Sequence, residues 1–307
     1  MFDIDFISGW RRRRRALRRR FNPYIVGTPV FDRHLFFGRE TLAQRALDLL
    51  DSQSIQLTGE RRIGKTSFLH HLHRTLAAES GGERRSFPIF VDLEAVTARD
   101  LFHALMEETV LALAVAPRTL AELRFNCGQS EYLAVDFAHD LRRILDETSS
   151  RNQQSVRLVF LIDEIDAVCA GPAPIGNAWL AGLLSNEAPQ LQVVLAGVSL
   201  GACTQHAAPL PGVALEALEL EPFAPGDAEA LVREPVADVF RYERRAVERI
   251  LQVSRLRPFA IQRLCLHAVD RMLDEGRTTV RVSDVEAASR ADAGSAKMFS
   301  MTERSLT

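Results

Sequence analysis

The sequence predicts an α/β fold, in which a doubly wound parallel sheet of five strands is followed by a C-terminal α-helical lid. Three observations predict it. Five short apolar runs alternate with helical segments, which is typical of parallel sheets. A glycine-rich loop stands between the first run and a helical segment. Beyond residue 223, the apolar residues mainly follow helical spacing.

The predicted strands differ in how clearly the sequence marks them. Leu158–Ile162 is a continuous apolar run, which suits a central strand buried on both faces. Leu215–Leu220 alternates in polarity and gives a weaker signal. The five predicted strands are Ser54–Thr58, Phe87–Leu93, Leu158–Ile162, Gln192–Ala196 and Leu215–Leu220.

The loop after the first strand fits the pattern GxxxxGK[ST]. A strand before this loop and a helix over Ser67–Ala78 after it form an arrangement that cradles phosphates, because the loop N–H groups and the helix dipole attract anions. We expect Lys65 to reach the β- and γ-phosphates of ATP and the Thr66 hydroxyl to hold Mg²⁺. The residues expected to bind the nucleotide here are Gly59, Glu60, Arg61, Arg62, Ile63, Gly64, Lys65, Thr66 and Ser67.

The use of basic residues supports a special role for Lys65. Of 38 basic residues only Lys65 and Lys297 are lysines, and the others are arginines. A lysine in the interior of such a chain indicates a need for its compact ammonium group.

Two acids, Asp163 and Glu164, follow the apolar run Leu158–Ile162. In a parallel sheet they would lie at the carboxyl edge, beside the glycine loop, where ligands bind. We expect Asp163 to hold Mg²⁺ with Thr66, and Glu164 to orient or deprotonate the attacking water. Lys65 and Glu164 are thus the predicted catalytic residues. The alternative, two solvated acids in a turn, is less favoured after a phosphate-binding loop.

Composition excludes several classes of protein. A chain with 47% hydrophobic and 25% charged residues is neither disordered nor collagen-like. No apolar run approaches the ~18 residues of a membrane helix, and the N-terminus does not resemble a signal peptide. Four widely spaced cysteines without a CxxC pair predict reduced thiols in the cytoplasm. They are Cys127, Cys169, Cys203 and Cys265.

The charge is unevenly distributed along the chain. Residues 1–20 hold eight arginines and two acids, a net +6, whereas the remainder carries a net −8. Such an arm, Arg11–Arg20 above all, is either a solvated tail or a contact for nucleic-acid phosphates. Docking to an acidic protein is a further alternative, and an anionic membrane is an unlikely partner.

The sequence divides into four predicted parts: a basic arm over 1–21, the core over 22–222, the lid over 223–293 and a flexible tail over 294–307. In the lid, helical spacing covers Arg244–Val253 and Phe259–Leu273, and Thr278–Val282 reads as an extended piece. Ser283 and Glu286 have the spacing of a capping box that opens a last helix.

From about Asn22 to Ala288 the chain resembles the STAND branch of the AAA+-related P-loop ATPases. The predicted sheet and lid are then a P-loop ATPase core with its helical lid. The matching pieces are the opening Asn22–Gly27, the FxGRE-like box Phe36–Glu40, the paired arginines in the loop, the sensor-1-like strand Val194–Ser199, the passage Leu218–Val232, and Leu256–Gln262, which is similar to the GxP motif.

The resemblance implies further nucleotide contacts. Gly38 and Arg39 of the FxGRE-like box would lie near the adenine, and Pro258 of the GxP-like motif would approach the nucleotide from the lid. The alternative for Pro258 is that it only starts a helix. Leu256 stands where the family usually has glycine, which is a departure from the motif.

The resemblance also implies a function: a regulatory ATPase that binds ATP·Mg²⁺, hydrolyses it slowly and assembles with itself or with an effector protein. No Arg or Lys lies between Arg157 and Arg233, so the usual place of an arginine finger is empty. Two alternatives stay open. One is a DNA-associated ATPase, similar to initiators and transposition regulators, that uses the arm; the other is a nucleotide-dependent scaffold in a defence or signalling complex.

Overall fold

A computed structural model describes residues 21–78, 84–126, 131–152, 155–169, 191–198 and 215–291. The chain divides into two compact units. One is a sheet unit over Arg39–Glu221, and the other is a helical unit built from the residues before Arg39 and after Glu221. Residues 1–20 of the predicted arm, the predicted tail, and the segments around Cys127, Cys203 and Asn177–Gln190 lie outside the described residues.

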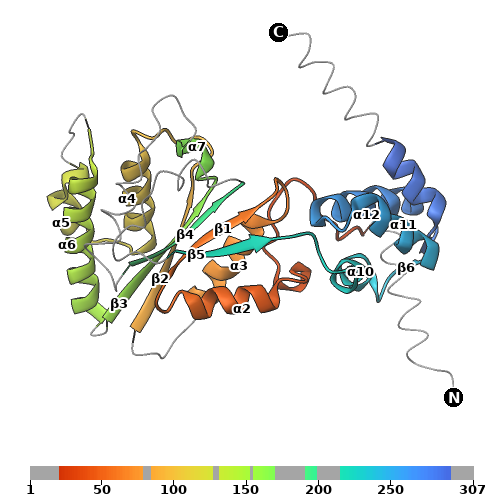
Figure 1. The fold of residues 1–307 in the computed structure, drawn as a ribbon, viewed down its shortest axis with the longest axis horizontal. Coiled ribbons are helices and arrows are strands. Elements are labelled where there is room, and N and C mark those ends of the chain that lie inside the picture. Colours follow the sequence, from red (N-terminus) through yellow and green to blue (C-terminus); the bar gives the residue numbers. More distant parts are fainter. Residues whose placement is uncertain are drawn as a thin grey trace, which may run out of the picture. The chain divides into compact units, whose positions relative to one another are not determined.

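The sheet unit contains five parallel strands in the order β2-β3-β4-β1-β5, which confirms the predicted doubly wound sheet (Figure 1). The strands are β1 Ser54–Gly59, β2 Arg84–Asp92, β3 Ser155–Asp163, β4 Leu191–Gly197 and β5 Leu215–Leu220. In this order β1, β4 and β3 are neighbours, so their carboxyl ends meet at one edge. The loop after β1 and the acids after β3 are thereby brought together.

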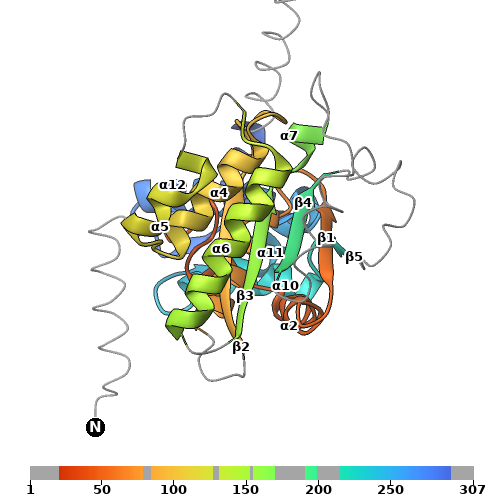
Figure 2. The ribbon, with the colours of Figure 1, turned by 90° about the vertical axis from the view of Figure 1, so that its left-hand side faces the viewer.

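Helices cover both faces of the sheet. Figure 1 shows α4 and α6 on one side of the sheet and α2 and α3 on the other, and Figure 2 shows α4 and α6 together in front of the sheet. The helices of this unit are α2 Glu40–Leu49, α3 Lys65–Ala78, α4 Leu101–Ala112, α5 Pro117–Glu122, α6 Ala134–Asn152 and α7 Asp166–Cys169, with the short 3₁₀ turn η2 Arg124–Asn126.

Burial follows the position of each strand in the sheet. In β3 every residue after Ser155 is buried, as expected for an inner strand covered on both faces. The edge strand β5 alternates between exposed and buried residues near its end, which explains its weaker signal in the sequence. The apolar core between the sheet and α4 and α6 includes Met106, Phe137 and Phe160.

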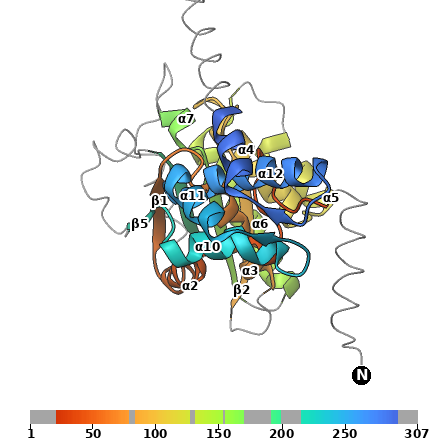
Figure 3. The ribbon, with the colours of Figure 1, turned by 90° about the vertical axis from the view of Figure 1, so that its right-hand side faces the viewer.

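The helical unit has its own apolar core, and Figure 3 shows its helices α10, α11 and α12. Its elements are η1 Arg33–Leu35, α10 Pro225–Arg233, η3 Glu234–Val236, β6 Arg241–Tyr242, α11 Arg244–Ser254, α12 Pro258–Asp274, β7 Thr279–Val280 and a last helix over 282–291. In α11 the buried residues Ala246, Val247 and Ile250 recur at helical spacing, so one face packs on this core.

Residues 22–38, which the sequence predicts as part of the core with the sheet, group with the helical unit instead. Hydrogen bonds explain the difference. The Asn22 side chain donates to the carbonyl of Leu266 and to Asp270 on α12. The Tyr24 hydroxyl donates to the carbonyl of Val232 at the end of α10. Tyr24 is only 3% exposed, so this segment is part of the core of the helical unit.

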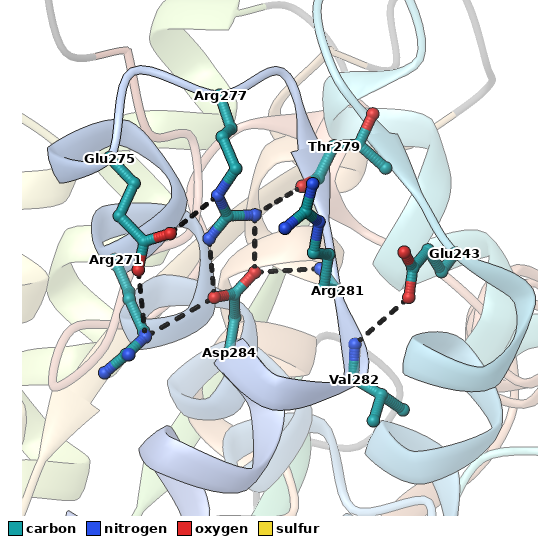
Figure 4. Close-up of polar contacts among 8 residues, drawn as sticks. All are labelled: Glu243, Arg271, Glu275, Arg277, Thr279, Arg281, Val282 and Asp284. Carbon is teal, nitrogen blue, oxygen red and sulfur yellow. Dashed lines mark hydrogen bonds and ion pairs between the residues drawn. The ribbon is translucent and has the colours of Figure 1, made fainter.

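A buried acid, Asp284, fixes the start of the last helix (Figure 4). Its oxygens accept hydrogen bonds from the Arg277 guanidinium at 2.7 and 3.0 Å. One of them also accepts from the backbone N–H of Arg281 at 2.8 Å. The helix begins at residue 282, so Asp284 occupies its third position and Ser283 lies inside the helix. The predicted capping box beginning at Ser283 is therefore wrong by two residues.

The cysteines also differ from expectation. Cys265 is a free, buried thiol, and burial raises its pKa to about 12. Cys169, at the end of α7, is disulfide-bonded, so the prediction of reduced thiols fails at this position. Among the described residues, no helix is long and apolar enough to cross a membrane.

Candidate nucleotide-binding site

The glycine-rich loop joins the carboxyl end of β1 to the start of α3, as the sequence predicts. A Cβ at Gly59 would lie 2.9 Å from the carbonyl oxygen of Leu220, so only glycine fits there. Gly64 has a φ of +106°, which other residues rarely adopt, and Arg62 turns the loop with a φ of +63°. These features shape a tight loop that leads its backbone N–H groups toward the helix start.

Lys65 is buried, with 5% of the residue exposed, and its ammonium group lies within this loop. It donates hydrogen bonds to the carbonyls of Gly59 at 2.9 Å and Glu60 at 3.1 Å. Burial lowers the pKa of Lys65, and the carboxylates of Glu164, Asp163 and Asp166 partly oppose that shift. The positive charge of the site is therefore fixed between the loop and the acids after β3.

Asp163 ends β3 and lies beside the first turn of α3. The Thr66 hydroxyl is hydrogen-bonded to its carboxylate. Asp163 is 2% exposed, and burial raises its pKa, with a smaller contribution from the charge of Asp92. A hydroxyl next to a carboxylate is an oxygen donor set that suits Mg²⁺, so the residues present fit the predicted metal.

Glu164 follows Asp163 with a φ of +52°, a left-handed conformation that is uncommon for glutamate. Its backbone N–H donates to the Asp163 carboxylate at 3.0 Å. Next to it, the N–H of Ile165 donates to the carbonyl of Ala196 on β4 at 3.1 Å. Burial, followed by the charge of Asp163, raises the pKa of Glu164, which makes it a stronger base than an exposed glutamate.

Two further acids, which no sequence motif marks, act on the same site. Asp92 ends β2 and pairs in register with Asp163, and its charge acts on that residue. Asp166 begins α7, accepts the backbone N–H of Val198 and acts on Lys65. The sequence places Asp92 near the end of a predicted strand, but only the strand order of the structure shows that this strand is the neighbour of β3.

The other predicted contacts fall in both units. Ser67 is half-buried in the first turn of α3. Arg39 precedes α2 in the sheet unit, and its guanidinium donates to the carbonyl of Glu221. Gly38, with a φ of +64°, belongs to the helical unit, where a Cβ would overlap Asp227. Contact of Gly38, Arg39 and Pro258 with nucleotide stays a prediction.

Pro258 occupies the first turn of α12, which agrees with its helix-starting role. Before it, Arg255 and Leu256 both have left-handed backbones, with φ of +50° and +59°. Leu256 thus keeps a conformation that favours glycine, the residue its motif usually has. The turn is held by the Phe223 N–H, which donates to the Leu256 carbonyl at 2.9 Å.

Comparison with known proteins places this site in a family. The model of a family described as an AAA domain matches residues 50–202, which include both the glycine-rich loop and the acids after β3. The chain belongs to the AAA+-like P-loop ATPases. No curated protein sequence matches it.

Solved structures of AAA+-like ATPases share the fold. A Walker-type ATPase of Pyrococcus abyssi aligns with a TM-score of 0.66 and 16% identity, over 93% of this chain and 80% of that one. Aeropyrum pernix ORC1, solved with DNA, aligns with a TM-score of 0.58 and 18% identity, over 84% and 66%. The Thermotoga maritima RuvB branch-migration motor aligns with a TM-score of 0.51 and 14% identity, over 83% of this chain and 70% of that one.

Proposed function

We propose that this protein is a STAND-type regulatory ATPase that binds ATP·Mg²⁺ and hydrolyses it slowly, as a switch of conformation or assembly. One observation carries the proposal. Lys65, Thr66, Asp163 and Glu164 come from two segments 98 positions apart and converge at one sheet edge. This set of residues suits phosphoryl transfer to water, which depends on positioning and electrostatics.

Each residue has a defined task in that reaction. The loop N–H groups and the Lys65 ammonium bind the phosphates, and Thr66 and Asp163 hold Mg²⁺. When bound, Mg²⁺ supplies positive charge that offsets the charge developing between the β- and γ-phosphates. Glu164, beside Asp163, orients the attacking water and accepts its proton. Gly38, Arg39 and Pro258 are the further nucleotide contacts in this proposal.

Slow turnover follows from the lack of an arginine finger in its usual place. The stretch between Arg157 and Arg233 has no Arg or Lys, so no arginine finger can come from the region before the sensor-1-like strand. Such a finger is worth about 10³–10⁵-fold in rate. A cytoplasmic switch that assembles with copies of itself, or with an effector protein, needs no faster chemistry.

Two variants test the proposal. Lys65→Ala should abolish ATP binding, because it removes the cation held between the loop and the acids. Glu164→Gln should keep ATP binding and stop hydrolysis, because an amide cannot accept the proton. Nucleotide affinity and phosphate release would be measured for both, with Arg118→Ala as the control, since Arg118 is a 93% exposed side chain on α5. Undiminished turnover in Glu164→Gln would remove the proposed base.

A DNA-associated ATPase is the second candidate, favoured by the net +6 of residues 1–20 against an acidic remainder. ORC1, which has a similar fold, was solved in complex with DNA. If the arm binds duplex DNA, each neutralised phosphate adds about 0.9 to the slope of log affinity against log salt. Full-length protein should then bind DNA with a steep salt dependence, and a chain that begins at Phe21 should not. Equal binding by both would reject this candidate.

The scaffold alternative makes a different prediction for the same measurements. A scaffold would retain ATP tightly and release almost no phosphate. Phosphate release that depends on Glu164 would reject it, and tight ATP retention without release would favour it over the switch.

A further inference from the structure

The proposed reaction needs a cation at the γ-phosphate that the stretch before the sensor-1-like strand does not supply. Charge grows on the γ-phosphoryl oxygens in the transition state, and fixed cations stabilise it. Among the described residues, the cations that act on Glu164, and thus on the place of the attacking water, are Lys65 and Arg61. Lys65 is already held by two loop carbonyls.

Arg61 lies in the glycine-rich loop directly after Glu60, whose carbonyl accepts one of the Lys65 hydrogen bonds. Its side chain is exposed, and within the described residues no hydrogen bond or ion pair holds it. The guanidinium is thus free to rotate toward a phosphate, and little of its hydration is lost before a nucleotide arrives.

The charge of Arg61 acts on two groups of the site. It acts on Lys65 and on Glu164, whereas Lys65 is the cation that acts on Asp163. Arg61 is therefore a loop cation whose charge acts on Glu164, the residue proposed to accept the proton of the attacking water. The next residue, Arg62, has a left-handed backbone that turns the chain immediately after Arg61.

We propose that Arg61 is a catalytic residue that acts in cis in place of an arginine finger, with its guanidinium on the γ-phosphoryl oxygens. This inference rests on the proposed ATP hydrolysis. The water oxygen forms a bond to the γ-phosphorus, and the bond from phosphorus to the bridging β–γ oxygen breaks. Its electron pair stays on the β-phosphate of ADP, and Glu164 takes the water proton. Arg61 binds the equatorial oxygens while their charge is greatest.

The test compares Arg61→Ala and Arg61→Lys with wild type and with Arg118→Ala, the exposed surface control. For Arg61→Ala we expect kcat to fall on the order of 10²-fold. The dissociation constant for ATP should change by less than about threefold, because Lys65 and the loop N–H groups still bind the ground state. Arg61→Lys should restore part of the rate, since lysine brings the charge without the planar fork.

A binding measurement separates this role from a structural one. ADP with aluminium fluoride, a transition-state mimic, should form a stable complex with wild type and with Arg118→Ala but not with Arg61→Ala. ADP with beryllium fluoride, a ground-state mimic, should bind all of them. Wild-type kcat in Arg61→Ala, or an equal loss of both complexes, would overturn the role of Arg61. A wild-type protein that neither binds nor hydrolyses ATP would instead overturn the proposed function itself.

Discussion

The hydrogen bond between the Thr66 hydroxyl and the Asp163 carboxylate joins the first turn of α3 to the last residue of β3. Between these two residues lie more than ninety positions of sequence, and the parallel order of β1, β4 and β3 brings them together. Asp163 is almost fully buried, so the hydrogen bond from Thr66 both stabilises the charged carboxylate and holds it in position. The first two predictions concern this pair.

Thr66→Ala should weaken ATP binding in the presence of Mg²⁺ and have much less effect in its absence. The methyl group cannot ligate the metal, whereas Thr66→Ser keeps the hydroxyl and should bind like wild type. Nucleotide affinity measured with Mg²⁺ and with EDTA checks this. An equal loss in both conditions would mean that Thr66 supports the fold of the loop and does not hold the metal.

Asp163→Asn should raise the stability of the nucleotide-free protein at neutral pH. The pKa of Asp163 is raised in the folded state, so ionising it there opposes folding, and this cost disappears as pH falls from the folded pKa to the lower unfolded pKa. The advantage of the asparagine variant over wild type should therefore shrink in acid. Melting temperatures across this pH range, without nucleotide, measure the difference.

Saturating ATP·Mg²⁺ should reverse that order. Ligand binding stabilises the folded state by RT ln(1 + [L]/Kd), and the asparagine variant should have lost most of its affinity. Wild type should then melt at the higher temperature. If Asp163→Asn were less stable than wild type without nucleotide, the Asp163 carboxylate would stabilise the fold itself, and the prediction would be wrong.

The sequence predicts the sheet and the loop well because their signals are local. The apolar run before Asp163 and the GxxxxGK[ST] pattern each lie within about ten residues. The start of β3 is predicted less well, at Leu158, because Arg157 looks like a surface residue. In the structure Arg157 is 6% exposed and within the strand, since its guanidinium donates to the Ser86 hydroxyl and to the Leu50 carbonyl.

Long-range partners explain the other differences. Nothing near Asn22 in the sequence indicates that its amide binds α12, more than two hundred residues later. Asp284 was expected inside a capping box, but its position depends on Arg277, which folds back from the preceding turn. The charge of Asp92 on Asp163 depends on strand order, which spacing alone does not fix.

Gly59→Ala should destabilise the protein and weaken ATP binding. A Cβ at Gly59 would lie 2.9 Å from both the Leu220 carbonyl and an Ile63 methyl, and overpacking of this kind costs about 1–3 kcal/mol. Gly226→Ala is the matched control. Gly226 is in the first turn of α10, has open space around it, and should gain about 0.5–1 kcal/mol. Denaturant unfolding of both variants gives the comparison.

Asp284→Ala should destabilise the helical unit by about 3–5 kcal/mol, because it leaves the Arg277 guanidinium unpaired where that side chain is only 16% exposed. Glu248→Ala, which breaks the exposed pair with Arg244, should cost less than about 1 kcal/mol. Denaturant unfolding would again be measured. The double variant Arg277→Ala with Asp284→Ala should lose less than the sum of the single losses; simple additivity would mean that the pair is not coupled.

Removal of residues 1–20 should leave folding and ATP binding intact, whereas removal of residues 1–26 should destabilise the helical unit. The longer deletion takes away Tyr24, which is buried, donates to the Val232 carbonyl and accepts from the Tyr242 hydroxyl at 3.0 Å. It would leave a cavity. It would also leave the Val232 carbonyl and the Tyr242 hydroxyl without these partners, and each buried polar group without a partner costs about 1–3 kcal/mol. Tyr24→Phe isolates the polar part and should cost less than the deletion. Melting temperatures of the four proteins check the order: full length and the shorter deletion highest, Tyr24→Phe next, and the longer deletion lowest. If the two deletions melted alike, the contacts of Asn22 and Tyr24 would not hold this segment on the helical unit.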